Sequence, residues 1–179
     1  VLRPEMAFGT GHHETTYMMM QSMLDNADLI RDNVVMDMGC GTALLAILAA
    51  KMGAAKVYGI DIDAVAAQSA YDNARLNRVG RKVETYCGDA SLLQMGKYNV
   101  LLANIHRNII IMDLRTYAGS LKAGGLLMLS GFYTTDVEAI MAEAVKYGLK
   151  LVCERERDGW ACLTLRRTSP VSISSILGA

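Results

Sequence analysis

The feature that most constrains the fold of this chain is a regular alternation of short, β-rich apolar runs with helical patterns. The apolar runs cover residues 34–38, 56–61, 82–87, 99–103, 125–131, 149–154 and 160–166. Helical patterns cover residues 43–52, 64–77, 108–121 and 135–147, and one more, 15–24, precedes the first run with a threonine available as its N-cap. Strands that alternate with helices in this way predict parallel βαβ units in a doubly wound α/β sheet. Only the last two runs are close enough to form an antiparallel hairpin.

Composition excludes several classes of protein. The chain has 179 residues, enough for one ordinary domain, and its 18 basic residues balance 18 acidic ones. Bulk charge therefore gives no reason to expect direct binding of nucleic acid or of an anionic membrane. The longest clean apolar run, residues 43–50, is too short to span a membrane. The opening residues do not read as a secretory signal and the four cysteines are scattered, so we expect a cytoplasmic protein with reduced thiols and no structural zinc.

The first predicted strand runs directly into a glycine-containing loop. Gly39 and Gly41 lie between this strand and the next predicted helix, where glycine lets the backbone approach a ligand closely. A dinucleotide fingerprint needs a further glycine where this chain has Leu44, which disfavours a nicotinamide cofactor. We therefore predict that Asp37, Gly39 and Gly41 belong to a different cofactor site, with a purely structural turn as the alternative.

Acidic residues follow the second and third predicted strands, at the edge where doubly wound sheets bind ligands. Asp61 comes 22 residues after Gly39, a place where a carboxylate can accept hydrogen bonds from both hydroxyls of a ribose. The alternative role, a cap for the next helix, fits Asp63 better. Asp89 can accept a hydrogen bond from an adenine amine, or can form an Asx turn.

The fourth predicted strand delivers Asn104 to the same edge. Its side-chain carbonyl is an acceptor at the point where a transferred group should lie, and Asn108 is a better candidate for capping the next helix. His106, in the same loop, is a weaker candidate for a base, because an isolated loop histidine is more often solvated or structural.

Residues 8–16 form the other conspicuous stretch, with two glycines, two histidines and several further polar groups. We predict a mobile loop that folds over a cofactor, hinged at Gly9 and Gly11. A metal site is the alternative. Because the adjacent His12 and His13 point apart on an extended loop, and no third ligand has suitable spacing, we expect no metal.

On these motifs the chain resembles a known family. Residues 37–41 and 59–63 resemble the class I S-adenosylmethionine-dependent methyltransferases. Within that class, residues 8–16, 103–105 and 129–131 resemble the ribosomal protein L11 methyltransferases, and the resemblance covers essentially residues 4–167. It implies a seven-stranded, Rossmann-like sheet with a reversed carboxyl-terminal hairpin.

The resemblance also implies an activity: transfer of the methyl group of S-adenosylmethionine to lysine or amino-terminal amines of a ribosomal protein of the large subunit. Residues 8–13 would form a lid, and Asn104 would hold the acceptor amine as the catalytic residue. Taken with the residue-based predictions, the expected cofactor contacts are Phe8, Thr10, His13, Thr16, Asp37, Gly39, Gly41, Asp61, Asp89 and Asn104.

The chain departs from the family's pattern in two places and in extent. The family usually has a third glycine at the position of Ala43, and a proline at the position of Glu14. It also begins with a separate substrate-gripping domain, so we expect residues 1–167 to be the methyltransferase domain alone and residues 168–179 to be a disordered tail.

Two other functions stay open at this point. One is a methyltransferase for another protein, nucleic-acid or small-molecule substrate. Methyltransferases for glutamine or for a nucleic-acid base typically have Asn/Asp-Pro-Pro-Tyr after the fourth strand, and residues 104–107 contain no proline. The other is a non-catalytic module that only binds the cofactor.

Overall fold

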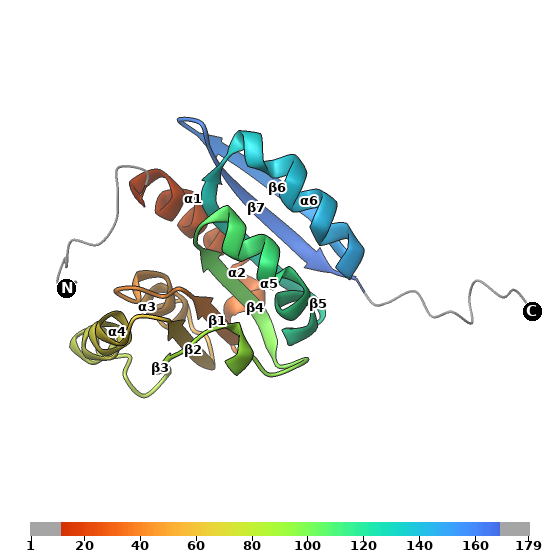
Figure 1. Ribbon diagram of the computed structural model, residues 1–179. Coiled ribbons are helices and arrows are strands. Elements are labelled where there is room, and N and C mark those ends of the chain that lie inside the picture. The colour runs from red at the N-terminus through yellow and green to blue at the C-terminus, as the bar shows by residue number, and fades with distance from the viewer. Residues whose placement is uncertain (1–11, 169–179) are drawn as a thin grey trace, which may run out of the picture.

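The computed structural model describes residues 12–168 of the chain, drawn in Figure 1. The predicted lid residues Phe8 and Thr10 and the tail from residue 169 lie outside the described residues. The elements in chain order are α1 (His12–Asp25), α2 (Ala27–Ile30), β1 (Val34–Met38), α3 (Leu44–Lys51), β2 (Lys56–Asp61), α4 (Ala64–Leu76), β3 (Val83–Cys87), the 3-10 turn η1 (Ala90–Leu92), β4 (Tyr98–Asn104), α5 (Arg107–Ser120), β5 (Leu121–Tyr133), η2 (Thr134–Asp136), α6 (Val137–Ala144), η3 (Val145–Tyr147), β6 (Leu149–Arg157) and β7 (Trp160–Arg167).

The strands form one seven-stranded sheet in the order β3-β2-β1-β4-β5-β7-β6. Strands β1 to β5 are parallel, while β7 runs antiparallel to both β5 and β6. The predicted fold class is therefore confirmed, including the reversed hairpin at the carboxyl end. The strand order changes direction between β1 and β4, which is the point where doubly wound sheets bind ligands.

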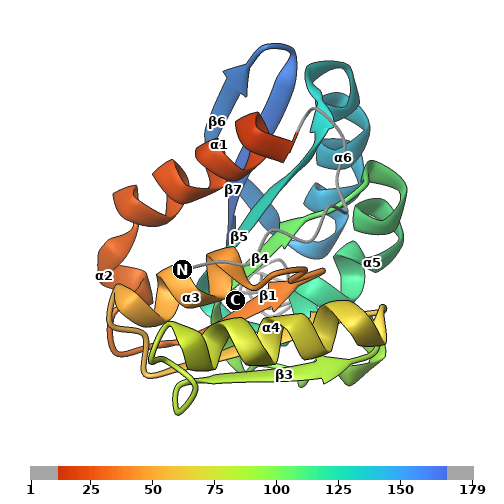
Figure 2. The same cartoon turned by 90° about the vertical axis from the view of Figure 1, so that its left-hand side faces the viewer.

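Helices cover both faces of the sheet, so its central strands are buried on both sides. Figures 1 and 2 show α1, α3 and α4 on one face and α5 and α6 on the other. Each face of the sheet has its own hydrophobic core beneath its helices. Along β4, Val100 and Leu102 pack into the core under α1, α3 and α4, while Leu101 and Ala103 pack into the core under α5 and α6. This double burial explains why the strands read as continuous apolar runs instead of alternating with polar residues. No helix within residues 12–168 is long and apolar enough to cross a membrane.

Several predicted boundaries are wrong. Helix α1 begins at His12 instead of residue 15, so Thr15 and Thr16 lie inside the helix, and both are buried. Asn108 does not cap α5, because the helix begins at Arg107 and the residue before it, His106, makes no capping hydrogen bond.

The ends of β5 and β7 also differ from the prediction. Strand β5 begins at Leu121 instead of residue 125, because Leu121 already pairs with Tyr98, before a register shift brings Leu126 opposite Val100. At the other end, Thr168 was predicted to begin the tail. Its amide N–H and its hydroxyl both donate to the Gly148 carbonyl, each at 2.9 Å, so this residue is held against the sheet.

Candidate functional site

The loop after β1 folds onto the end of β2. The amide N–H groups of Gly39 and Cys40 donate to the Ile60 carbonyl at 2.8 and 3.0 Å. Asp61 Oδ2 accepts a hydrogen bond from Gly41 N at 2.9 Å, and its Oδ1 accepts one from Asp63 N at 3.0 Å. A carboxylate offers about four acceptor positions, so each Asp61 oxygen keeps capacity for a ligand hydroxyl. The predicted glycine loop and the predicted ribose acid therefore form one structural unit.

The acid that caps α4 is Asp63, as predicted. Its Oδ1 accepts a hydrogen bond from Val65 N at 2.9 Å, which satisfies one of the unpaired amide groups at the start of the helix. Because Asp63 supplies the cap, Asp61 is not needed for that role.

Asp37 lies behind the glycine loop and is only 2% exposed. Its Oδ2 accepts a hydrogen bond from Ala46 N in the first turn of α3 at 3.1 Å, in place of the cap that Ala43 cannot provide. Burial raises the pKa of Asp37 to about 7, the hydrogen bond from Ala46 opposes that shift, and the negative charge of Asp61 adds to it. Through this hydrogen bond the Asp37 carboxyl group links the end of β1, where the glycine loop begins, to the first turn of α3.

Ala43 occupies a backbone conformation that favours glycine. Its φ is +64° and its ψ is 25°, in the left-handed region, and the residue is fully buried ahead of α3. A residue with a Cβ pays about 1–2 kcal/mol for this conformation. Glycine would therefore have a conformational advantage at this position, where the resemblance implies a third glycine.

Three loops that are distant in sequence meet around Ile105. At Gly39, with a φ of +66°, a Cβ atom would lie 2.4 Å from Ile105 Cγ2. At Gly131, with a φ of +98°, a Cβ atom would lie 2.4 Å from the Ile105 carbonyl oxygen. Ile105 N also donates to the Ser130 carbonyl at 3.0 Å. The segments 37–41, 103–105 and 129–131 therefore pack together only because glycine stands at both contact points.

Asn104 and Thr16, which are 88 residues apart, are brought together by β4 and α1. Asn104 Nδ2 donates to Thr16 Oγ1 at 3.4 Å. Thr16 is 6% exposed, and Asn104 is half-buried at the carboxyl end of β4. Because its amide nitrogen faces Thr16, the Asn104 carbonyl oxygen is left available to an incoming group.

The other predicted residues have the following places. Asp89 is exposed, and its Oδ1 accepts a hydrogen bond from Ser91 N at 2.9 Å, which is the Asx turn considered as its alternative role. Its pKa is lowered mainly by hydrogen bonding from Ser91. His13 is exposed in the first turn of α1, so this end of the predicted lid is helical. His106 is exposed as well.

Two residues that shape the site were not identified from their own chemistry. Ile105 is an apolar loop residue, which gives no chemical signal in a sequence. Ser130 is fully buried and its hydroxyl donates to the Ala161 carbonyl at 2.7 Å, which fixes the end of β5 against β7. Within residues 12–168 there is no group of three or more His, Cys, Asp or Glu side chains placed to hold a metal ion.

Comparison with known proteins gives consistent matches. A family model described as "Ribosomal protein L11 methyltransferase (PrmA)" matches residues 1–168. A ribosomal protein L11 methyltransferase from Porphyromonas gingivalis is 47% identical over 171 residues, which cover 95% of this chain and 58% of the relative. The chain thus spans about three fifths of the length of this relative.

Solved structures show the same fold. The crystal structure of a ribosomal protein L11 methylase from Lactobacillus delbrueckii subsp. bulgaricus superposes with a TM-score of 0.82 at 24% identity, over 89% of this chain and 81% of that one. An RNA methyltransferase from Salinibacter ruber, solved in complex with S-adenosyl-L-homocysteine, superposes with a TM-score of 0.68 at 19% identity, over 84% and 91% of the two chains.

Proposed function

The chain belongs to the ribosomal protein L11 methyltransferase (PrmA) family, and on that premise we propose that it transfers the methyl group of S-adenosylmethionine to amino groups of a large-subunit ribosomal protein. Lysine and amino-terminal amines are the acceptors that we propose. The observation that carries the proposal is the meeting of the glycine loop, Asp61 and Asn104 at the carboxyl edge of the sheet, beside the change in strand order.

The described residues fit the proposed cofactor. The backbone at Gly39 is free of a side chain where the loop approaches Ile105, and Asp61 retains acceptor positions on both oxygens for the two hydroxyls of a ribose. Asp89 is exposed beyond β3, where its second oxygen can accept a hydrogen bond from an adenine amine. When bound, S-adenosylmethionine supplies an electrophilic methyl group on a sulfonium.

The acceptor amine must be neutral before it can attack. For a lysine with a reference pKa of ~10.4, losing the proton costs about 4–5 kcal/mol at pH 7. Apolar surroundings lower this cost because they disfavour the ammonium form. The proton passes to water before each transfer, so no dedicated side-chain base is required.

Asn104 is the residue that we propose to orient this amine. Its carbonyl oxygen accepts a hydrogen bond from the amine N–H, while its own amide nitrogen stays on Thr16. This leaves the nitrogen lone pair directed at the methyl group, so the protein contributes chiefly by alignment and by exclusion of water.

The test is mass spectrometry of the ribosomal protein after incubation with the chain and S-adenosylmethionine, at high concentration of the ribosomal protein. We expect added methyl groups on amines. Asn104→Ala should lower the rate by about 10-fold to 100-fold, the value of one hydrogen bond to a group with developing charge. The matched control is Asn108→Ala, on the exposed first turn of α5, which should not change the rate.

A non-catalytic role makes a different prediction. The left-handed conformation of Ala43 is the observation that favours it, because a residue with a Cβ atom is strained there and the resemblance implies a glycine at this position. Under that role, calorimetry detects binding of S-adenosylmethionine, but no methyl group reaches the ribosomal protein at any concentration. That result would reject the transferase proposal.

A further inference from the structure

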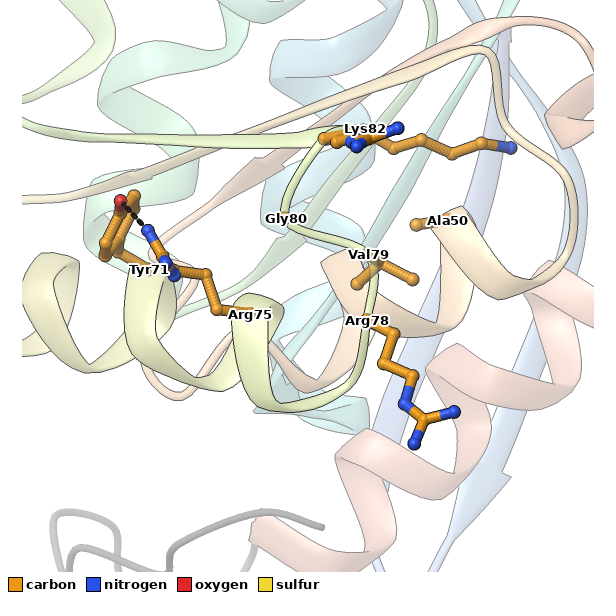
Figure 3. A pocket seen from close by; sticks show the side chains of 8 residues that line it. Ala50, Tyr71, Arg75, Arg78, Val79, Gly80 and Lys82 are labelled. Atoms are coloured by element: carbon orange, nitrogen blue, oxygen red, sulfur yellow. Dashed lines mark hydrogen bonds between the residues drawn. The ribbon is translucent and has the colours of Figure 1, made fainter.

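A second candidate site lies at the opposite end of the sheet, between α4 and β3. Residues 75–82 contain four basic residues and no acidic one, in a chain with 18 of each. Because this segment precedes β3, it lies at the amino ends of the parallel strands (Figure 2). Gly39 and Asp61 lie at the other end, since Gly39 follows β1 and Asp61 is the last residue of β2. It borders a pocket of about 720 Å³ whose lining contains no carboxylate: Ala50, Tyr71, Arg75, Arg78, Val79, Gly80, Arg81 and Lys82 (Figure 3).

Within the part of the chain that the structure describes, the basic side chains of this segment lack ion-pair partners, and the carboxylate charge that acts on Arg75 is that of Asp72 on α4. None of the four basic side chains, from Arg75 to Lys82, forms an ion pair among residues 12–168. Two further lysines reach the segment: Lys51 Nζ donates to the Asn77 carbonyl at 3.3 Å and Lys56 Nζ to the Arg81 carbonyl at 3.5 Å. Of these six cations, Lys56 alone has an ion-pair partner among residues 12–168, and that partner is Glu84.

Arg78 stands where a glycine is the ordinary residue. It follows the end of α4 with a φ of +62°, and the next residue, Val79, donates its N–H to the Ala74 carbonyl at 3.0 Å. This is the pattern of a helix end that normally uses glycine at the left-handed position. A strained, exposed arginine is unfavourable for the helix, which suggests that its side chain is kept for another role.

An aromatic ring lies among the cations. Arg75 Nη1 donates to the Tyr71 hydroxyl at 2.8 Å, and its guanidinium lies 5.5 Å from the centre of the Tyr71 ring. The Tyr71 side chain is nevertheless 43% exposed, so part of the ring can accept a stacked group. Figure 3 shows Arg75 turned toward Tyr71 while Arg78 points away from that pair. The cations are thus spread around the loop, which suits a chain of phosphates better than a single anion.

We propose that this pocket binds single-stranded nucleic acid. Its basic side chains would contact successive phosphates, and Tyr71 would stack on a base, which is the combination that proteins use to hold single strands. The proposal goes beyond the methyltransferase function and does not depend on it. It also revises the expectation from composition, because a net charge of zero hides a local cluster of six cations.

The test uses the full chain and a fluorescently labelled oligouridylate of ~12 nucleotides, with binding followed by anisotropy over a range of salt concentrations. If four side chains contact phosphates, the logarithm of the association constant should fall with the logarithm of salt concentration with a slope of about −3, since each contact on a single strand contributes about −0.7. An oligodeoxythymidylate of the same length distinguishes RNA from DNA as the natural strand.

The decisive variant is Arg78→Gly. It removes one cation, so affinity should fall several-fold and the salt slope should weaken by about 0.7. The melting temperature should rise, because glycine adopts the left-handed conformation without strain. Binding and stability therefore move in opposite directions, and a loss of affinity cannot be ascribed to unfolding. Lys150→Gln, which removes an exposed cation from β6, is the control and should leave the affinity unchanged.

Several results would overturn the proposal. They are absence of binding at low salt, binding that does not depend on salt, an Arg78→Gly variant that binds as tightly as the parent chain, and an equal loss in Lys150→Gln. Displacement of the oligonucleotide by uridine monophosphate at the same concentration would also reject it, because the pocket would then recognise one nucleotide and not a strand.

Discussion

Asp61 connects the glycine loop to α4, and its charge can be removed with little change of shape. Asp61→Asn should weaken S-adenosylmethionine binding at least about tenfold, because a charged acceptor of a hydrogen bond contributes about 1.5–3 kcal/mol. Calorimetry measures the change. Asp63→Asn is the matched control two residues away: asparagine is a good N-cap, so binding should hardly change. Equal affinities for Asp61→Asn and the parent chain would reject the ribose assignment.

Asp37 predicts a pH dependence of stability. Its pKa in the folded chain, about 7, lies above the ordinary aspartate value of 3.8, so between about pH 4 and about pH 7 the folded state keeps a proton that the unfolded state has lost. The free energy of unfolding should therefore decrease as pH rises through this window, by at most about 1.4 kcal/mol per pH unit.

Asp37→Asn isolates this contribution, because an asparagine oxygen can still accept the hydrogen bond from Ala46. We expect urea unfolding between about pH 5 and about pH 7 to show a flatter dependence for the variant. The difference between the two chains is the informative quantity, since other carboxylates affect both equally. Parallel curves would mean that Asp37 is ionised throughout this range.

At the scale of the elements, the contact between the end of β5 and the loop after β4 depends on Gly131. Gly131→Ala should destabilise the fold by about 2–4 kcal/mol, because the new Cβ would meet the Ile105 backbone and the residue would also be strained at φ +98°. Gly124→Ala is the control on the same strand. It has a φ of +77° with nothing within 4 Å of the new Cβ, so it should cost only the conformational strain of about 1–2 kcal/mol. Similar losses of unfolding free energy in urea for the two variants would show that the contact with Ile105 is unimportant.

The alternation of elements could be predicted from the sequence because burial on both faces makes strands such as β4 continuous apolar runs, which are easily recognised. Element ends could not. The sequence pattern places Leu121 at the end of a helix, because a single apolar residue suits a helix or a strand equally well. In the structure Leu121 pairs with Tyr98 on β4, ahead of a shift in register. That pairing depends on tertiary structure and leaves no local signal in the sequence. The threonines of α1 resemble a helix cap in sequence, yet packing against the sheet buries them inside the helix.

The candidate site could be predicted in part for a similar reason. Asp61 and Asn104 are polar residues at strand ends, so the topology alone places them at one edge. Ile105 could not be identified, because its role is to fill the space left by Gly39 and Gly131, and that complementarity exists only after three strands have come together. The basic cluster at residues 75–82 is not visible in the net charge, because acidic residues elsewhere in the chain balance it.

At the scale of the whole molecule, the described domain places its two candidate sites at opposite ends of one sheet. The cofactor residues follow the strands and the basic segment precedes β3. A strand of nucleic acid bound at the second site would leave the carboxyl edge open to an amine. The two proposals are therefore compatible, and loss of one activity should not abolish the other.

The chain spans 58% of the Porphyromonas gingivalis relative, and we propose that it corresponds to the methyltransferase domain, with substrate recognition shared with the additional length of such relatives. Stable recognition of a protein usually needs about 800 Å² of surface on each partner. A tethered recognition domain also raises the local concentration of the acceptor, typically to the millimolar range for short flexible linkers. The proposed cofactor contacts, in contrast, all lie within this chain. A polypeptide of these 179 residues should for that reason bind S-adenosylmethionine about as well as the full-length relative does.

Methylation should behave differently from binding in that comparison. The 179-residue polypeptide must meet its acceptor by collision, so its kcat/KM for the ribosomal protein should lie far below that of the relative, while kcat at saturating substrate should fall much less. Steady-state rates over a wide range of ribosomal protein concentration separate the two constants. A fusion of the relative's additional residues to this chain should restore kcat/KM without changing cofactor affinity. If the polypeptide alone already matches the relative in kcat/KM, its own surface recognises the substrate and the division of labour proposed for the two parts is wrong.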